Sequence, residues 1–171
     1  ELWQKRLMVA GLPKVFEIGR IFRNEGMSDE HAQDYTQLEF YEAYKEYREG
    51  MEMIRDLYRT IADEVYGTRL FTIRGIEVDL GKEWETYDFC ALMQKAYGFD
   101  PRELAGDMEE KEARAFAQKF DLDEKDEVTN IGRVVDTLWK RVRQGIPGPG
   151  FLVNVPAYLE PLAKRDPRDP R

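Results

Sequence analysis

The sequence predicts an α+β protein with a mainly antiparallel sheet flanked by helices. Two stretches near the start, residues 15–24 and 35–43, alternate in polarity and are rich in β-branched and aromatic side chains, as paired strands are. Two shorter strand-like stretches, residues 70–73 and 76–80, are separated by an Arg-Gly turn signal, which favours a hairpin. Elsewhere apolar residues recur at three- and four-residue steps, the period of a helix.

The first strand follows a turn signal at residues 11–13. A polar connection, residues 26–34, separates it from the second strand. This connection exceeds the two to five residues usual for a hairpin. A long polar loop on a rigid hairpin is a common place for functional residues.

The remaining chain predicts four helices and a final strand. The first helix is expected to end at Gly67 and the second at Gly98, because glycine readily adopts the left-handed conformation that closes a helix. A loop rich in proline and glycine, residues 145–150, precedes the strand, which begins at Phe151. The expected helices cover residues 47–65, 89–97, 108–120 and 131–142, and the final strand covers residues 151–155.

Composition narrows the class of protein. The 171 residues are 42% hydrophobic, which excludes disorder caused by low hydrophobicity. No apolar run approaches the length of a membrane helix. The net charge of −8 argues against non-specific coating of nucleic acid. A single cysteine, Cys90, excludes an internal disulfide framework and a cysteine-based zinc site, and fits a reducing cytosol.

One group of side chains indicates chemistry. If the first two strands pair, one face of the hairpin collects Arg23, Glu25, Tyr35, Glu39 and Tyr41. Arginine holds phosphate or carboxylate through two parallel hydrogen bonds, an aromatic ring stacks on a purine, and Glu39 with Tyr41 suits an ammonium group. The alternative is a solvated sheet face with cross-strand ion pairs.

Other features carry open alternatives. His31, the only histidine, either neutralises polyphosphate from the loop or has no role. The basic face of the helix expected at residues 131–142 is either solvated or in contact with a nucleic acid, the solvated face being the better interpretation. Cys90 is expected to be an inert buried thiol. The basic face comprises Arg133, Lys140, Arg141 and Arg143.

The stretch FRNEGMSDEHAQDYTQLEFYEAY resembles motif 2 of class II lysyl-tRNA synthetases, whose subclass also holds the aspartyl and asparaginyl enzymes. That motif is a strand-loop-strand with Phe-Arg-Asn/Asp-Glu, a variable loop, and then aromatic-Thr-x-x-Glu/Asp. Within the subclass, Glu39-Phe40-Tyr41 resembles the Glu-x-Tyr of the lysine enzyme. The resemblance extends to residues 1–7 and 159–165, and it is loose over residues 82–128.

The resemblance implies an ATP site. Arg23 would bridge the ATP α-phosphate and the amino acid carboxylate, and so act as the catalytic residue. Glu25 would contact the adenine amino group, Tyr35 would stack on adenine, and His31 would approach the outer phosphates. Ala32 stands where the family often has Asn, which removes a polar contact.

The resemblance also implies a lysine site. Glu39 and Tyr41 would line the lysine pocket, Arg23 would hold the carboxylate, and Glu1 would contact the α-amino group. No metal ligand is expected within this chain, since the family's Mg²⁺ ligands would lie beyond residue 171.

Residues 1–171 are therefore expected to form part of a class II synthetase catalytic domain, with the motif 2 hairpin at about residues 15–44. Motif 1, motif 3 and the anticodon-binding domain are absent from this sequence. The parent is expected to be a cytoplasmic homodimer that joins lysine to tRNA(Lys) with ATP, the isolated chain being inactive. The alternatives are a paralogue that lysylates a protein and a catalytically dead binding module.

Overall fold

The computed structural model describes residues 2–24, 26, 31–73, 75–122 and 129–168. The chain divides into two compact units, residues 1–54 and 55–171, and each is described by itself. Within the described residues, no helix is long and apolar enough to cross a membrane.

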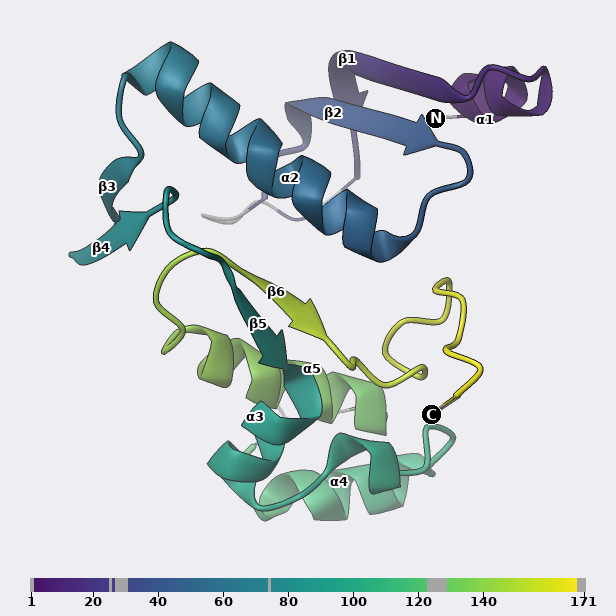
Figure 1. The fold of residues 1–171 in the computed structure, drawn as a ribbon. Helices are drawn as coiled ribbons and strands as arrows, with labels where there is room; N and C mark the ends of the chain where they lie inside the picture. The colour runs from purple at the N-terminus through teal and green to yellow at the C-terminus, as the bar shows by residue number, and fades with distance from the viewer. Residues whose placement is uncertain (1, 25, 27–30, 74, 123–128, 169–171) are drawn as a thin grey trace. The chain divides into compact units, whose positions relative to one another are not determined.

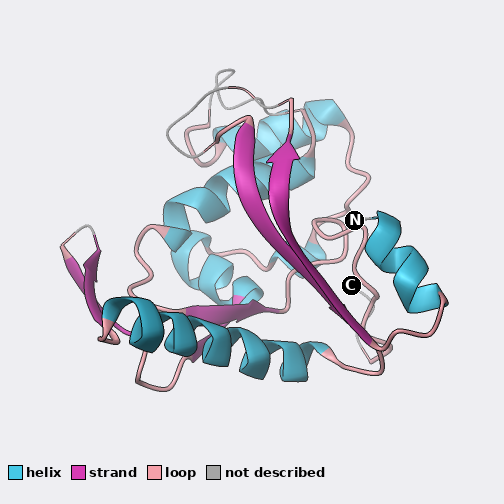
Figure 2. Ribbon diagram, turned by 90° about the horizontal axis from the view of Figure 1, so that it is seen from above, coloured by secondary structure: helices cyan, strands magenta, loops and turns pink. Residues whose placement is uncertain are grey.

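The first unit is built around a long β-hairpin. Strands β1 (Lys14–Phe22) and β2 (Asp34–Glu42) pair antiparallel along their whole length, from Lys14 opposite Glu42 to Phe22 opposite Asp34. The two strands twist around each other as a ribbon (Figure 2). This hairpin confirms the strand pair that the sequence predicted, with bounds one or two residues different.

Helix α1 (Leu2–Val9) precedes the hairpin and packs against it. A turn at Gly11, whose φ of +98° suits glycine, leads from the helix into β1. The sequence analysis did not predict this helix. Its apolar residues are largely exposed, as with Trp3 at 71%, so the helix shows little of the two-faced pattern that periodicity detects.

The second unit holds most of the helices and two further pairs of short strands, β3–β4 and β5–β6 (Figure 1). Helix α2 (Tyr47–Ile61), which contains the boundary between the units, continues as one π-helical turn, η1 (Ala62–Tyr66), and ends at Gly67 with φ +66°. The other elements are β3 (Leu70–Ile73), β4 (Ile76–Asp79), β5 (Glu85–Asp88), α3 (Phe89–Tyr97), η2 (Pro101–Glu103), α4 (Glu110–Gln118), α5 (Ile131–Arg143) and β6 (Gly150–Val153).

The core of the second unit lies where α3, α4 and α5 meet. Helix α5 presents an apolar stripe to it, as the three- and four-residue spacing predicted. Helix α3 begins at Asp88, whose carboxylate accepts from the Ala91 amide at 2.8 Å, and it ends at Gly98 with φ +78°. The residues with no exposed surface are Met93, Ala113, Ile131, Val134, Val135 and Leu138.

The described residues form three two-stranded sheets. The pairs β1–β2 and β3–β4 are antiparallel, as predicted, whereas β5 and β6 pair in parallel. The sequence analysis missed β5, which is only four residues long. The first residue of β6 is Gly150. A Cβ at this position would lie 2.3 Å from the Tyr87 ring, so only glycine allows the two strands to pair this closely.

We expect Leu138→Ala to lower the free energy of unfolding of the second unit by about 2–5 kcal/mol, because it leaves a cavity in a fully buried site. Urea unfolding followed by circular dichroism measures the change. Leu162→Ala is the matched control, since the Leu162 side chain is fully exposed. Equal effects of the two substitutions would contradict this description of the core.

Candidate active site

The β-hairpin has two faces of opposite character. Its apolar face carries Phe16 opposite Phe40 and Ile18 opposite Leu38. The polar face carries Arg23 just beyond the end of β1, with three predicted site residues on β2. The Arg23 amide donates to the Gln33 carbonyl at 2.9 Å, so the pairing continues past the strand end. The three β2 residues are Tyr35, Glu39 and Tyr41.

The register sets the order of these groups along the polar face. Tyr35 lies opposite Ile21, next to the Arg23 end, and Glu39 lies opposite Glu17, four residues further along β2. Because a strand rises about 3.3 Å per residue, the six steps along the chain from Glu17 to Arg23 span about 20 Å. The face therefore offers a cationic end and an anionic end to one extended ligand.

Of the other predicted site residues, the structure describes His31 but not Glu1 or Glu25. His31 lies in the connection between the strands, three residues before β2, and is exposed. Glu1 and Glu25, predicted to contact the amino group of lysine and that of adenine, lie outside the described residues.

Hydrogen bonds between alternate residues of β2 hold the anionic end in place. The Tyr41 hydroxyl donates to Glu39 Oε1 at 2.9 Å, and the Gln37 amide donates to Glu39 Oε2 at 3.3 Å. The Tyr35 hydroxyl donates to Gln37 Oε1 at 3.4 Å. Both carboxylate oxygens of Glu39 thus have donors, which fixes the carboxylate before any ligand arrives.

Sequence reasoning did not single out Glu17 and Gln37 of this face, or Gln4 of α1, as candidate site residues. Alternation placed Glu17 and Gln37 on the correct faces of their strands, but only the register shows that Glu17 lies opposite Glu39. Gln4 of α1 is 3% exposed and donates from Nε2 to Glu17 Oε2 at 3.1 Å. No pattern in the sequence indicated that contact, because it joins residues thirteen positions apart through an unpredicted helix.

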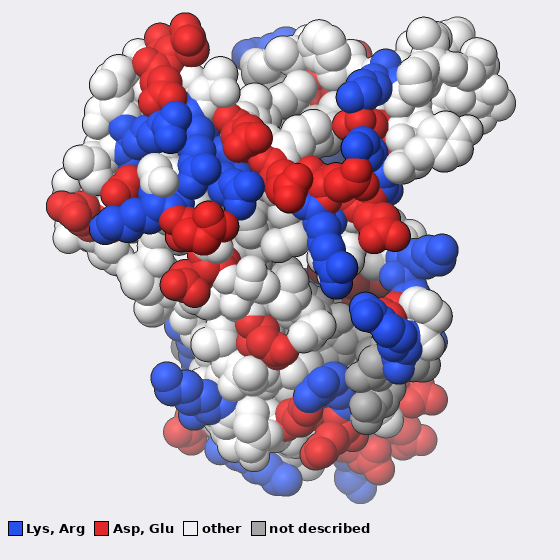
Figure 3. All heavy atoms as spheres, in the orientation of Figure 1, with Lys and Arg blue, Asp and Glu red and all other residues white. Residues whose placement is uncertain are grey.

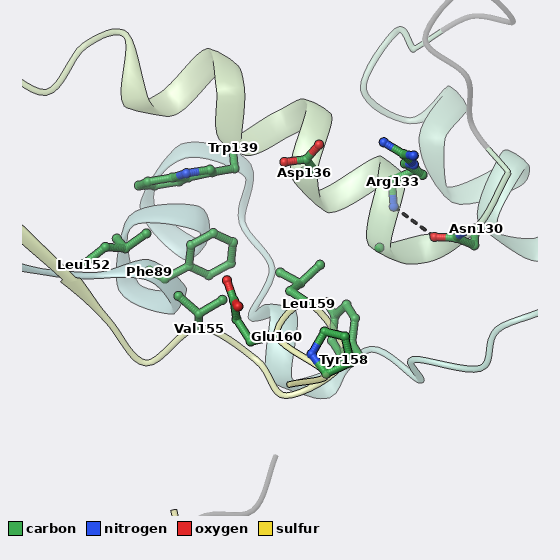
Figure 4. A pocket seen from close by; sticks show the side chains of 12 residues that line it. Phe89, Asn130, Arg133, Asp136, Trp139, Leu152, Val155, Tyr158, Leu159 and Glu160 are labelled. Carbon is green, nitrogen blue, oxygen red and sulfur yellow. Dashed lines mark hydrogen bonds between the residues drawn. The ribbon is translucent and has the colours of Figure 1, made fainter. Parts of the chain in front are cut away.

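A separate hollow of about 380 Å³ lies in the second unit, between α5 and the segment after β6. Figure 4 shows the Phe89 and Trp139 rings at one end and Asn130 with Arg133 at the other. The two rings pack with centroids 4.9 Å apart, and Asn130 accepts from the Arg133 amide at 3.0 Å as the cap of α5. These contacts account for the aromatic pair and for Asn130 as structural elements.

The basic face of α5 contains local partners. Lys140 pairs with Asp136 one turn earlier, at 3.0 Å, and Arg141 donates to the Phe120 carbonyl at 3.4 Å. Acidic and basic side chains are also interspersed on the face of the molecule in Figure 3. The local partners of Lys140 and Arg141 favour the solvated alternative for the α5 face over a surface for tRNA.

Cys90 lies in α3 and is buried. Its Sγ donates to the Asn154 carbonyl at 3.2 Å. Burial raises the pKa of the Cys90 thiol to about 12, so the thiol stays protonated at neutral pH. This agrees with the inert thiol that the sequence predicted.

Metal binding finds no support in the part of the chain that the structure describes. There, no group of three or more His, Cys, Asp and Glu side chains lies close enough together to hold a metal ion.

Comparison with known proteins shows the class to which this hairpin belongs. The family described as "tRNA synthetases class II (D, K and N)" matches residues 1–171, the whole chain. The chain belongs to this family, and it forms a segment of a class II synthetase catalytic domain. The family uses ATP and Mg²⁺ and acts on an amino acid and tRNA.

Within this family, the chain is similar to proteins named lysine–tRNA ligase. The chain is 36% identical over 172 residues to "Lysine--tRNA ligase" of Bacillus subtilis (strain 168). It is 37% identical over 172 residues to the protein of the same name from Staphylococcus aureus (strain N315). In each case the match covers 100% of this chain and 34% of the relative. The chain therefore spans about a third of the length of these relatives.

We predict that a disulfide reagent labels Cys90 at least 100-fold more slowly in the folded chain than in urea at pH 8. The raised pKa leaves almost no thiolate in the folded state, and burial blocks access. Absorbance of the released thiolate reports the rate, and Cys90 is the only cysteine. Equal rates in the two states would contradict the assignment of Cys90 as inert.

Proposed function

We propose that this chain provides the ATP and amino acid contacts of motif 2 in a lysine–tRNA ligase. The reaction activates lysine with ATP to lysyl-adenylate and transfers the lysyl group to tRNA(Lys). The observation that carries the proposal is the polar face of the hairpin, with Arg23 at one end and the fixed Glu39 carboxylate at the other. The relatives named lysine–tRNA ligase support the choice of amino acid.

In the activation step, a lysine carboxylate oxygen attacks the α-phosphorus of ATP. The new oxygen–phosphorus bond forms as the bond to the bridging oxygen breaks, and pyrophosphate leaves with the electron pair of that bond. Arg23 holds both reacting groups, the carboxylate and the α-phosphate. Its charge stabilises the negative charge that gathers on the phosphoryl oxygens, and its planar fork orients the two groups for attack.

The other ATP contacts follow from position. Tyr35 lies next to the Arg23 end of the face, where its ring stacks on adenine, and Glu25 binds the adenine amino group. His31 approaches the outer phosphates from the connection between the strands.

The lysine contacts lie at the other end. Glu39 and Tyr41 receive the lysine side chain, and their mutual hydrogen bond fixes the carboxylate in one orientation. Glu1 binds the α-amino group. We also propose that the complete enzyme is cytoplasmic and works as a homodimer.

Arg23→Ala should reduce lysine-dependent ATP–pyrophosphate exchange at least 100-fold, because it removes charge stabilisation from the transition state. The assay uses the complete polypeptide that the gene encodes. Arg20→Ala is the matched control, since Arg20 lies on the opposite face of β1 and pairs with Asp34 there. Exchange near the wild-type rate in Arg23→Ala would refute the role given to Arg23.

An exchange panel over lysine, aspartate and asparagine tests the amino acid. We expect lysine to exceed aspartate at least 100-fold in kcat/KM, because aspartate would place its side-chain carboxylate against Glu39. Equal or greater activity with aspartate would overturn the assignment. Subsequent transfer of labelled lysine to tRNA or to protein distinguishes a ligase for tRNA from the protein-lysylating paralogue.

A further inference from the structure

The hollow in the second unit is lined by charged side chains on facing walls. Arg133, Asp136 and Trp139 stand at three-residue steps along α5, so they share one face of the helix and line the same wall. Glu160 lies on the opposite wall, in the segment after β6. Figure 4 shows the Glu160 carboxylate pointing towards the Phe89 ring, and it shows Asp136 between Trp139 and Arg133.

These charges do not neutralise one another across the hollow. Asp136 pairs with Lys140, one turn further along α5, at 3.0 Å. Within the part of the chain that the structure describes, neither the Arg133 guanidinium nor the Glu160 carboxylate makes a hydrogen bond or an ion pair. The hollow therefore presents one cation and one anion from facing walls, and each is available to a ligand group of opposite charge.

The wall that carries Glu160 is held in place without a ligand. At its start the Asn154 side-chain amide donates to Asp88 Oδ2 at 2.6 Å, and further along the Tyr158 hydroxyl donates to the Pro101 carbonyl at 3.1 Å. Asp88 is the cap of α3 and Pro101 begins η2, so the wall is tied to two other elements of the same unit. A ligand therefore meets a formed pocket, which keeps the entropic cost of binding low.

The other end of the hollow is apolar. The Phe89 and Trp139 rings pack there with an angle of 49° between their planes, and Figure 4 shows Leu152 and Val155 beside them. Leu152 is 39% exposed, so part of this apolar surface is open to a ligand. The volume of about 380 Å³ lies at the lower end of the range of about 300–1,000 Å³ found for small-molecule sites. A small metabolite with an apolar part suits this end.

We propose that this hollow binds a free α-amino acid with a large apolar side chain. Such a molecule carries an ammonium group, a carboxylate and the side chain on one carbon atom. Glu160 binds the ammonium group, and Arg133 binds the carboxylate through its planar fork. The side chain lies against the Phe89 and Trp139 rings, where it loses contact with water. The inference does not depend on the proposed function.

The presence of both charges favours a zwitterion over the simpler ligand classes. An organic cation would be repelled by Arg133, and an anion would be repelled by Glu160 and Asp136. A zwitterion instead pairs with Arg133 and Glu160 at the same time. A metal ion is not favoured either, because the described residues offer no group of three or more His, Cys, Asp and Glu side chains that could hold one.

The test measures binding of L-phenylalanine to the complete polypeptide by isothermal titration calorimetry. Arg133→Gln and Glu160→Gln should each raise the Kd about fivefold or more, because each removes one charge-assisted contact. Glu112→Gln is the matched control, since it makes the same substitution at an exposed carboxylate of α4 that does not line the hollow. It should leave the Kd within twofold.

Two analogues separate direct contact from a structural effect of the substitutions. Hydrocinnamate keeps the carboxylate and lacks the ammonium group, so its Kd should rise in Arg133→Gln and stay within twofold in Glu160→Gln. Phenethylamine keeps the ammonium group and lacks the carboxylate, so it should show the reverse pattern. An equal loss of affinity for both analogues in either variant would indicate damage to the pocket and would overturn the inference.

Two further results would also overturn the inference. One is the absence of binding at millimolar concentration for L-phenylalanine, L-leucine and L-methionine alike. The other is binding that both Arg133→Gln and Glu160→Gln leave unchanged, because the amino acid would then bind outside the hollow. Lysine-dependent ATP–pyrophosphate exchange is a separate measurement, so its result tests the proposed function without deciding whether this pocket binds an amino acid.

Discussion

The register of the β1–β2 hairpin is the constraint on which the candidate site depends. Nine residue pairs, from Lys14–Glu42 to Phe22–Asp34, decide which side chains share a face. A slip of one residue would bring the apolar side chains of one strand onto the polar face of the other. The register is supported on both sides, by Phe16 with Phe40 on one face and by the ordered polar side chains of β2 on the other.

The polar face holds ordered carboxylates from both strands. Each hydrogen bond along β2 links residues two apart, so the strand itself orients Glu39 without help from a distant element. Glu17 differs, because its orientation comes from Gln4 in another element. The two carboxylates are therefore positioned by independent means.

Much of the fold was predictable from local pattern. The alternation of polar and apolar residues predicted β1 and β2. The helical spacing of apolar residues, together with terminal glycines, predicted α2, α3 and α5 to within a few residues. Helix α1 and strand β5 were missed, since α1 has no clear apolar stripe and β5 is too short to show alternation. Within the site, alternation assigned each residue to a face of its own strand. It did not reveal the pair Glu17–Glu39 or the contact of Gln4, which depend on register and tertiary packing.

Because the hairpin has two different faces, it also limits where residues can be inserted or deleted. Adding or deleting one residue in the connection between the strands alters only the loop, because the strand pairing on either side is kept. The same change within β1 would exchange the two faces over the rest of the strand. Past a deletion at Gly19, for example, the large apolar side chain of Phe22, now 75% exposed on one face, would move to the face that carries Tyr35. As far as the pairing of the strands is concerned, insertions and deletions are therefore tolerable in the connection but not within β1 or β2.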